Sequence, residues 1–134
     1  MKIEELIEQL KFADGKTRNK AALELMDAGD QRACQPLVAA ICEVANEDNR
    51  GTLVYALGAF DCSAYIDLMV DLVISGNYEV ASCAFNIIEE TVLPIEKKIL
   101  IVDNLSKIDV SNLRYEHNSE AIAALQELLE SNDA

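Results

Sequence analysis

Apolar residues recur along most of the chain at the three- and four-residue spacing of amphipathic helices. In the first segment Ile3, Leu6 and Leu10 share one side, and acidic residues occupy the other. The last such segment is NSEAIAALQELLES, which we expect to begin at Ser119 as the N-cap. The pattern predicts an all-α fold with about eight helices.

The helical pattern repeats along the chain at an offset of 31 residues. Small or branched apolar residues return three times in each of four aligned columns. The columns are Ala22, Leu53 and Ala84; Met26, Leu57 and Ile88; Ala33, Ala64 and Ile95; Leu37, Leu68 and Ile99. Repeats of this length, each with two apolar-striped helices, are typical of a helical solenoid.

We expect the whole chain to form a single domain, in which a cap at each end encloses three repeats. The N-terminal cap helix falls in residues 1–15 and the C-terminal cap helix in residues 117–132. The repeats occupy residues 17–46, 48–76 and 77–107. Both terminal helices carry a polar outer face, which a solenoid cap requires.

The turn inside each repeat has a recognisable composition. Gly29 stands where a C-capping glycine belongs, and Asp30 can cap the next helix. Asp61 takes the place of Asp30 in the second repeat, 31 residues later. Pro36 and Pro94 fall in or near the first turn of the helices that follow, where proline is tolerated.

One predicted helix, in the middle repeat, has a single narrow polar stripe on an otherwise apolar surface. The stripe recurs every four residues and consists of Ser63, Asp67, Asp71 and Ser75. We expect this helix to be packed between neighbouring helices, with only the stripe facing water.

The segment NRGTLVYALGAFDC precedes that helix and holds two glycines, Gly51 and Gly58. Each glycine costs a helix roughly 1 kcal/mol relative to alanine. We therefore interpret both as positions where a neighbouring helix approaches closely.

The unit NKAALELMDAGDQRACQPLVAAICE resembles a HEAT repeat of the short bacterial type, as does the Asp48-Asn49-Arg50 run before the next helix. The resemblance covers about residues 17–107 and departs in the third repeat, where Tyr78-Glu79-Val80 replaces the arginine. It implies a short right-handed α-solenoid of about four HEAT-like helical pairs. It also implies that the second helices of the repeats line a concave side that receives a partner.

The composition changes the picture mainly through charge. The chain has 134 residues, with 24 acidic and 11 basic side chains and a net charge of -13. Such a field disfavours nucleic acid and anionic membranes and attracts a cationic partner, although it also serves solubility. No apolar run reaches the roughly 20 residues of a membrane span, and the acidic first helix is unlike a signal peptide. We expect a cytoplasmic protein.

The residues that usually carry chemistry give little sign of a catalytic site. Cys34, Cys42, Cys62 and Cys83 lie in apolar segments without metal-ligand spacing, so we expect them to be small buried hydrophobic residues. The single histidine, His117, is expected to be a loop or capping residue. Signatures of nucleophilic hydrolases, zinc peptidases and nucleotide-binding loops are absent from the sequence. We predict no enzyme activity, no cofactor and no metal.

The candidate contacts are polar residues on the second helices of the repeats, which the HEAT resemblance places on the concave side. They are Gln35, Glu43, Asp67, Asp71, Lys98 and Asp103. Tyr65 is either a further interface anchor or a core residue. The carboxylate pair of the middle helix also suits acid–base work or a metal, but a solvated helix face is the favoured interpretation.

The favoured hypothesis is a non-catalytic protein-protein interaction module, a monomer or weak dimer, that presents an acidic concave face to a partner protein. A narrower version makes it the neutraliser of a basic protein, such as a nuclease-type toxin. The alternative is a HEAT-like accessory enzyme, a lyase of the chromophore-attachment type, that binds a small ligand in the concave groove. A third hypothesis is a scaffold fragment that its partner completes.

Overall fold

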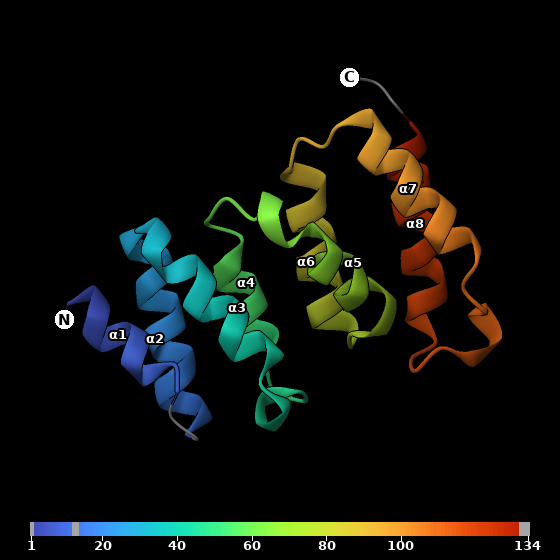
Figure 1. Cartoon of the computed structure of the whole chain (residues 1–134). Coiled ribbons are helices and arrows are strands. Elements are labelled where there is room, and N and C mark those ends of the chain that lie inside the picture. Colours follow the sequence, from blue (N-terminus) through green and yellow to red (C-terminus); the bar gives the residue numbers. More distant parts are fainter. Residues whose placement is uncertain (1, 12–13, 132–134) are drawn as a thin grey trace. The chain divides into compact units, whose positions relative to one another are not determined.

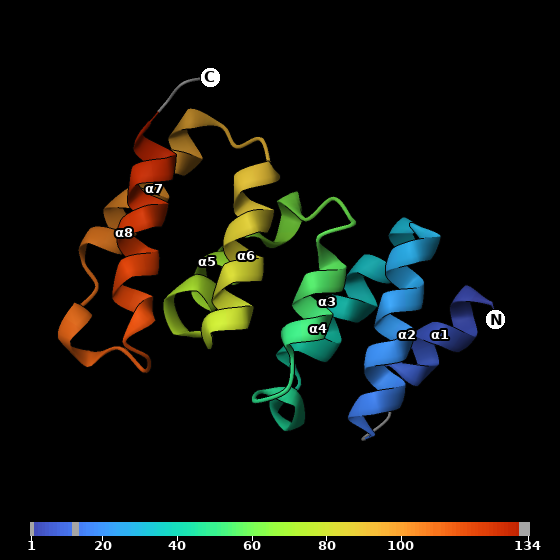
Figure 2. The same ribbon diagram turned by 180° about the vertical axis from the view of Figure 1, so that it is seen from behind.

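The structure, a computed structural model, describes residues 2–11 and 14–131, and all of their side chains except that of Val44. Eight α-helices and four short 3₁₀ turns make up the regular structure of these residues, among which there is no strand (Figures 1 and 2). The predicted all-α fold with about eight helices is confirmed. The solenoid arrangement of its repeats stays a prediction.

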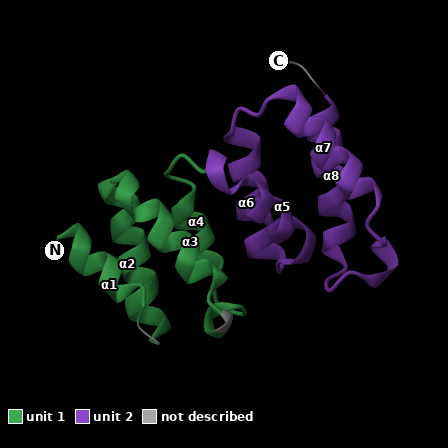
Figure 3. Cartoon of the chain, in the orientation of Figure 1, with its two compact units in different colours: residues 1–62 green, residues 63–134 purple. Residues whose placement is uncertain are grey.

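The chain divides into two compact units, residues 1–62 (unit 1) and 63–134 (unit 2), which Figure 3 colours separately. Unit 1 contains α1 (Ile3–Gln9), α2 (Gly15–Ala28), η1 (Gln31–Ala33), α3 (Cys34–Cys42), η2 (Val44–Asn46) and α4 (Gly51–Leu57). Unit 2 contains η3 (Ser63–Tyr65), α5 (Ile66–Ser75), α6 (Tyr78–Glu90), α7 (Ile95–Ser106), η4 (Val110–Asn112) and α8 (His117–Glu130).

Helix α2 organises unit 1, because it packs against both α1 and α4, and α4 also packs against α3. Ala21 and Ala22 on α2 are fully buried and let neighbouring helices come close. Branched side chains fill the space between the helices, and Leu25, Leu37, Ile41, Leu53 and Leu57 are among the largest that are fully buried. The core of unit 1 is thus largely aliphatic, in agreement with an aromatic content of 5% for the whole chain.

Unit 2 is built around α5 and α8. Helix α5 packs against α6 and α8, and α8 packs in addition against α6 and α7. The core side chains of α5 are Ile66, Met69, Leu72 and Val73. All four residues of the polar stripe on the other side of α5 are exposed. The stripe is thus the most exposed edge of α5, but Leu68, Val70 and Ile74 are half-buried, and Ser63 lies in η3, before the helix begins.

The first repeat turn has the caps that the sequence predicts. Gly29 ends α2 in the left-handed conformation, with φ of 65°, and its N–H donates to the Leu25 carbonyl. The Asp30 carboxylate accepts the Arg32 N–H at 3.0 Å and so caps η1. The Gln31 side chain then forms two hydrogen bonds of 3.1 Å with the backbone of Asp61. This pair of bonds holds the first repeat turn against the second.

Two local expectations are wrong. Helix α8 begins at His117 and not after Ser119, because Asn118 fixes an earlier start: its side chain accepts the Tyr115 N–H at 3.1 Å. Helix α4 ends at Leu57, and Gly58 is an exposed C-cap with ordinary right-handed φ and ψ, so no helix covers it. Gly51 is buried at the first position of α4, as a packing glycine would be.

Candidate functional site

The seven candidate contact residues fall in both units. In unit 1, Gln35 lies on α3 and Glu43 is its C-cap, and both are exposed. In unit 2, Tyr65 is half-buried at the N-cap of α5, Asp67 and Asp71 are exposed on α5, Lys98 is half-buried on α7, and Asp103 is exposed on α7. The half-buried Tyr65 leaves both of its proposed roles open.

Most of the negative charge lies in unit 2, a feature that the overall composition does not reveal. Unit 2 has 13 acidic and 4 basic residues, a net charge of -9, whereas unit 1 has 11 acidic and 7 basic residues, a net charge of -4. Helix α8 alone contains three glutamates and neither lysine nor arginine. A cation near unit 2 therefore meets a more negative potential than one near unit 1.

Asp67 and Asp71 form an acidic surface on α5 that is partly neutralised by a lysine. We call these two residues, together with Ser63 and Ser75, the acidic stripe. The Lys97 ammonium of α7 donates to Asp67 Oδ1 at 2.7 Å and so links α7 to α5. One turn further along, partial burial and then the charge of Asp67 raise the pKa of Asp71. The ionised form of Asp71 is thus disfavoured by its surroundings.

Helix α7 exposes an apolar surface that the repeat pattern does not predict. It packs on α8, with Ile101 and Leu105 buried, yet Ile95 is 53% and Ile99 is 63% exposed. In the repeat alignment these two isoleucines correspond to Ala33 and Leu37 of the first repeat, which are fully buried. Equivalent positions therefore have different surroundings in the first and third repeats.

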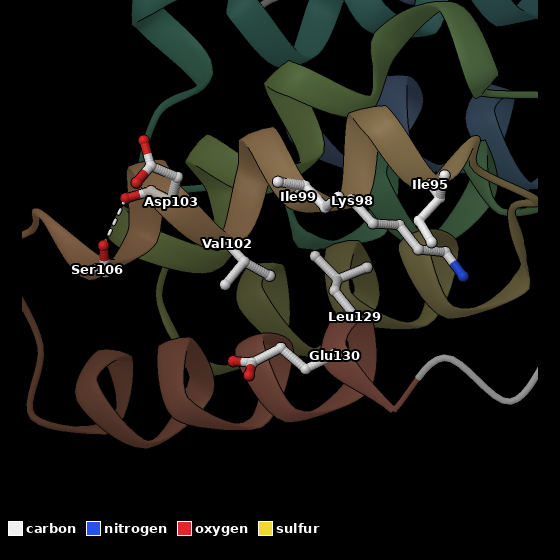
Figure 4. Close-up of a pocket in the computed structure, with 8 residues that line it drawn as sticks. All are labelled: Ile95, Lys98, Ile99, Val102, Asp103, Ser106, Leu129 and Glu130. Atoms are coloured by element: carbon white, nitrogen blue, oxygen red, sulfur yellow. Dashed lines mark hydrogen bonds between the residues drawn. The ribbon is translucent and has the colours of Figure 1, made fainter.

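An open groove of about 490 Å³ lies between α7 and the C-terminal end of α8. Figure 4 shows Val102 of α7 and Leu129 of α8 projecting towards the space between the two helices. Lys98 and Asp103, two of the predicted contact residues, also line this α7–α8 groove. The structure thus brings them to one surface, together with Ile95 and Ile99 of the repeat columns.

The sequence contains one signal of this groove. The segment between α7 and α8, residues 107–116, is mostly polar and contains only the short η4, so it supplies no helix long enough to cover α7. A third repeat followed by such a segment leaves the apolar residues of its second helix without a neighbour on one side.

A second open pocket, of about 290 Å³, lies between α6 and α8. Tyr78, Phe85 and His117 contribute aromatic rings to it, and Glu120 contributes a carboxylate. The His117 ring stacks on Tyr115 at a centroid distance of 5.3 Å and meets the Tyr78 ring edge-on at 5.8 Å. His117 Nε2 is 3.0 Å from the Gly76 carbonyl oxygen, to which it can donate. This histidine is therefore the first residue of α8 and has a structural hydrogen bond.

The expectation that all four cysteines are buried is wrong for Cys42, which is exposed at the end of α3, and Cys83 is only half-buried. Cys34 and Cys62 are buried; the Cys34 thiol donates to the Asp61 carbonyl at 3.8 Å, and the Cys62 thiol donates to the Leu57 carbonyl at 3.3 Å. Burial raises the pKa of Cys34 and raises that of Cys62 to about 12. At neutral pH this pair is held as thiols, which are poor nucleophiles.

Two further features concern the part of the chain that the structure describes. No group of three or more histidine, cysteine or acidic side chains there is arranged to hold a metal ion. Within the same residues, no helix combines the length and the apolar character needed to cross a bilayer.

Comparison of the chain with models of protein families, with curated proteins and with solved structures found no match. The resemblance to HEAT repeats is thus carried by the sequence pattern alone and stays a prediction.

Proposed function

We propose that the protein is a non-catalytic protein-binding module that presents an acidic helical surface to a basic partner protein. The observation that carries this proposal is the concentration of charge in unit 2, whose net charge is -9 against -4 for unit 1. Electrostatic complementarity of this kind speeds association and selects partners of the opposite sign. We take the protein to act in the cytoplasm, as a monomer or weak dimer.

The acidic stripe is the part of this surface that we expect to gain most from a partner cation. Partial burial and the charge of Asp67 disfavour ionised Asp71. A lysine or arginine placed beside Asp71 would offset both effects, because an opposite charge stabilises the ionised carboxylate. Lys97 already makes such a contact with Asp67 from within the chain.

The states of the usual nucleophiles and bases favour binding over catalysis. Cys34 and Cys62 are buried thiols of raised pKa, and His117 Nε2 is in hydrogen-bond contact with a backbone carbonyl. A nucleophile needs a lowered pKa or an adjacent base to react at neutral pH. The neutralisation of a basic toxin is the narrower form of this proposal, and it rests on charge.

Affinity capture from the native host's lysate tests the proposal, with elution in steps of rising salt and identification by mass spectrometry. We expect one basic protein to be released between low and moderate salt, because screening weakens exposed charge pairs. Asp67→Asn/Asp71→Asn should release it at lower salt than the wild type does. Glu24→Gln/Asp27→Asn removes the same charge from exposed residues of α2 and serves as the matched control.

Two results would contradict the proposal: capture of no basic protein, or equal elution of the two double variants. Equal elution would mean that the partner senses net charge and does not contact the acidic stripe.

A second candidate function is the binding of a small ligand in the pocket between α6 and α8. The observation that favours it is the combination of aromatic walls with Glu120 in a pocket of about 290 Å³, slightly smaller than usual ligand sites. A thermal-shift screen of small organic cations would test it. A hit that is lost in Glu120→Gln and retained in Glu127→Gln, a change on the same helix outside this pocket, would support this candidate.

A further inference from the structure

Helix α7 has two apolar stripes, and its neighbours cover only one of them. The covered stripe contains Ile101 and Leu105. The other contains Ile95, Ile99 and Val102, at the i, i+4, i+7 spacing that places side chains on one face of a helix. Because water surrounds large parts of Ile95 and Ile99, a partner that covers them removes apolar surface from solvent.

The shape of this surface suits a third helix. The α7–α8 groove runs between two packed helices and has Val102 and Leu129 at its centre (Figure 4). Helix α7 has 12 residues and is therefore about 18 Å long, which corresponds to about three turns of a partner helix. Side chains that recur every three or four residues on such a helix pack into the space between α7 and α8.

The charge around the groove indicates which helix would bind. On the α7 side the lining contains Lys98 and Asp103, and Asp103 already pairs with Lys107 at 3.1 Å. On the α8 side it contains Glu130, and α8 has no lysine or arginine to balance its glutamates. A second copy of the chain would bring another unit of net charge -9 to the same surface, and like charges disfavour that contact. A helix with lysines or arginines beside its apolar stripe meets the opposite sign.

We propose that the α7–α8 groove is a docking site for a basic amphipathic helix of a partner protein. The proposal rests on the function proposed above and names the partner's binding element. The apolar side chains of that helix contact Ile95, Ile99 and Val102, and its cations lie on the α8 side of the groove, near Glu130.

The test is a fluorescence-anisotropy titration of labelled synthetic peptides with the full-length protein. The probe peptide is a leucine and lysine helix with leucines on one face, and the control peptide has the same composition in shuffled order. A third peptide replaces each lysine with glutamate. We expect the probe to bind at least about tenfold more tightly than either of the others.

Two variants locate the binding surface. Ile99→Asp places a charge in the groove and should weaken probe binding at least about tenfold. Leu100→Asp makes the same change at the next residue of α7, which is 52% exposed and does not line the groove, and should leave binding unchanged. Both side chains are exposed, so both variants should fold, which circular dichroism checks.

The contrary results separate this inference from the proposed function. In one contrary result, the probe and the shuffled peptide bind equally, and Asp67→Asn/Asp71→Asn weakens binding while Ile99→Asp does not. This result refutes docking in the groove and still supports an acidic binding surface. If the probe does not bind, docking in the groove is also refuted. The lysate capture is an independent test of the proposed function. A dimer in sedimentation that Ile99→Asp dissociates means that a second copy occupies the groove, and the inference is wrong.

Discussion

At the scale of single residues, the buried polar side chains connect loops to helices. The Asn118 amide donates to the carbonyls of Val73 and Gly76 at 3.1 and 3.0 Å, and so fastens the end of α5 to the start of α8. Arg18 is buried on α2, where its guanidinium donates to the Asn46 side chain and to the Asn49 carbonyl. Each unit therefore uses a buried polar residue, through the hydrogen bonds it makes, to fix a connection.

Cysteine reactivity should differ sharply among the four thiols of the native protein. Exposed Cys42 should react with a maleimide within minutes at about pH 8, while buried Cys34 and Cys62 stay unmodified because their pKa values are raised. Half-buried Cys83, whose pKa burial also raises, should react more slowly than Cys42. Peptide mapping by mass spectrometry gives the order. Early labelling of Cys62 would contradict the buried pair.

Asp71 should lower stability at neutral pH. Its pKa in the folded protein is raised above the ordinary 3.8, so folding is opposed by ionisation. Its favourable contribution is present below pH 3.8 and is lost as pH rises through the raised pKa. We expect Asp71→Asn to raise the free energy of unfolding by a few tenths of a kcal/mol at neutral pH, and to have no such effect at about pH 3.

Urea unfolding of the Asp71 variant at the two pH values makes the measurement, with Glu24→Gln on α2 as the control for removal of one negative charge. An equal increase in the free energy of unfolding at both pH values would contradict this account, because the ionised carboxylate, disfavoured by burial and by Asp67, is then not the cause.

At the scale of the helix, the two glycines that follow α2 and α5 have different roles. Gly29 is needed for its positive φ of 65°, and a Cβ there would meet no atom within 4 Å. Gly76 has an ordinary extended backbone, but a Cβ there would lie 2.5 Å from the Leu72 carbonyl oxygen and 2.6 Å from Val80 Cγ1. Gly29 is therefore required by its left-handed backbone conformation, and Gly76 is required because the Leu72 carbonyl and the Val80 side chain leave no room for a Cβ.

Gly76→Ala should therefore be the more damaging of the two substitutions. We expect Gly29→Ala to lower the free energy of unfolding by about 1 kcal/mol, through left-handed strain alone. Gly76→Ala should lower it by about 2–3 kcal/mol, because the Leu72 carbonyl oxygen is backbone and must move with its helix. Denaturant unfolding of both variants tests the order. A smaller loss for Gly76→Ala would mean that the α5–α6 turn adapts easily.

The helices and several turns could be predicted from the sequence because their causes are local. The spacing of apolar residues predicts α5, and Gly29 with Asp30 predicts the turn after α2. The expected cap at Ser119 was wrong because the start of α8 also depends on Asn118, whose side chain accepts the Tyr115 N–H and donates to carbonyls more than 40 positions away. Exposure of Ile99 also depends on which helices lie near it, and the spacing within α7 does not contain that information.

At the scale of the whole chain, charge is distributed unevenly over two units that each have their own core. Unit 2 holds most of the net charge, the acidic stripe and the α7–α8 groove. The total of -13 could be counted from the sequence, but its division follows from where the compact units begin and end. Of the seven predicted contacts, Lys98 and Asp103 line that groove, and Asp67 and Asp71 belong to the acidic stripe.

The central claim is that unit 2 binds a basic partner through its charge. The most direct test is the affinity of the full-length protein for the protein recovered by capture, measured at about 0.05 M and about 0.5 M NaCl. We predict that affinity falls steeply with added salt, and that Asp67→Asn/Asp71→Asn weakens binding at low salt while Glu24→Gln/Asp27→Asn does not. An affinity that is independent of salt, or equal in the two variants, would contradict the claim.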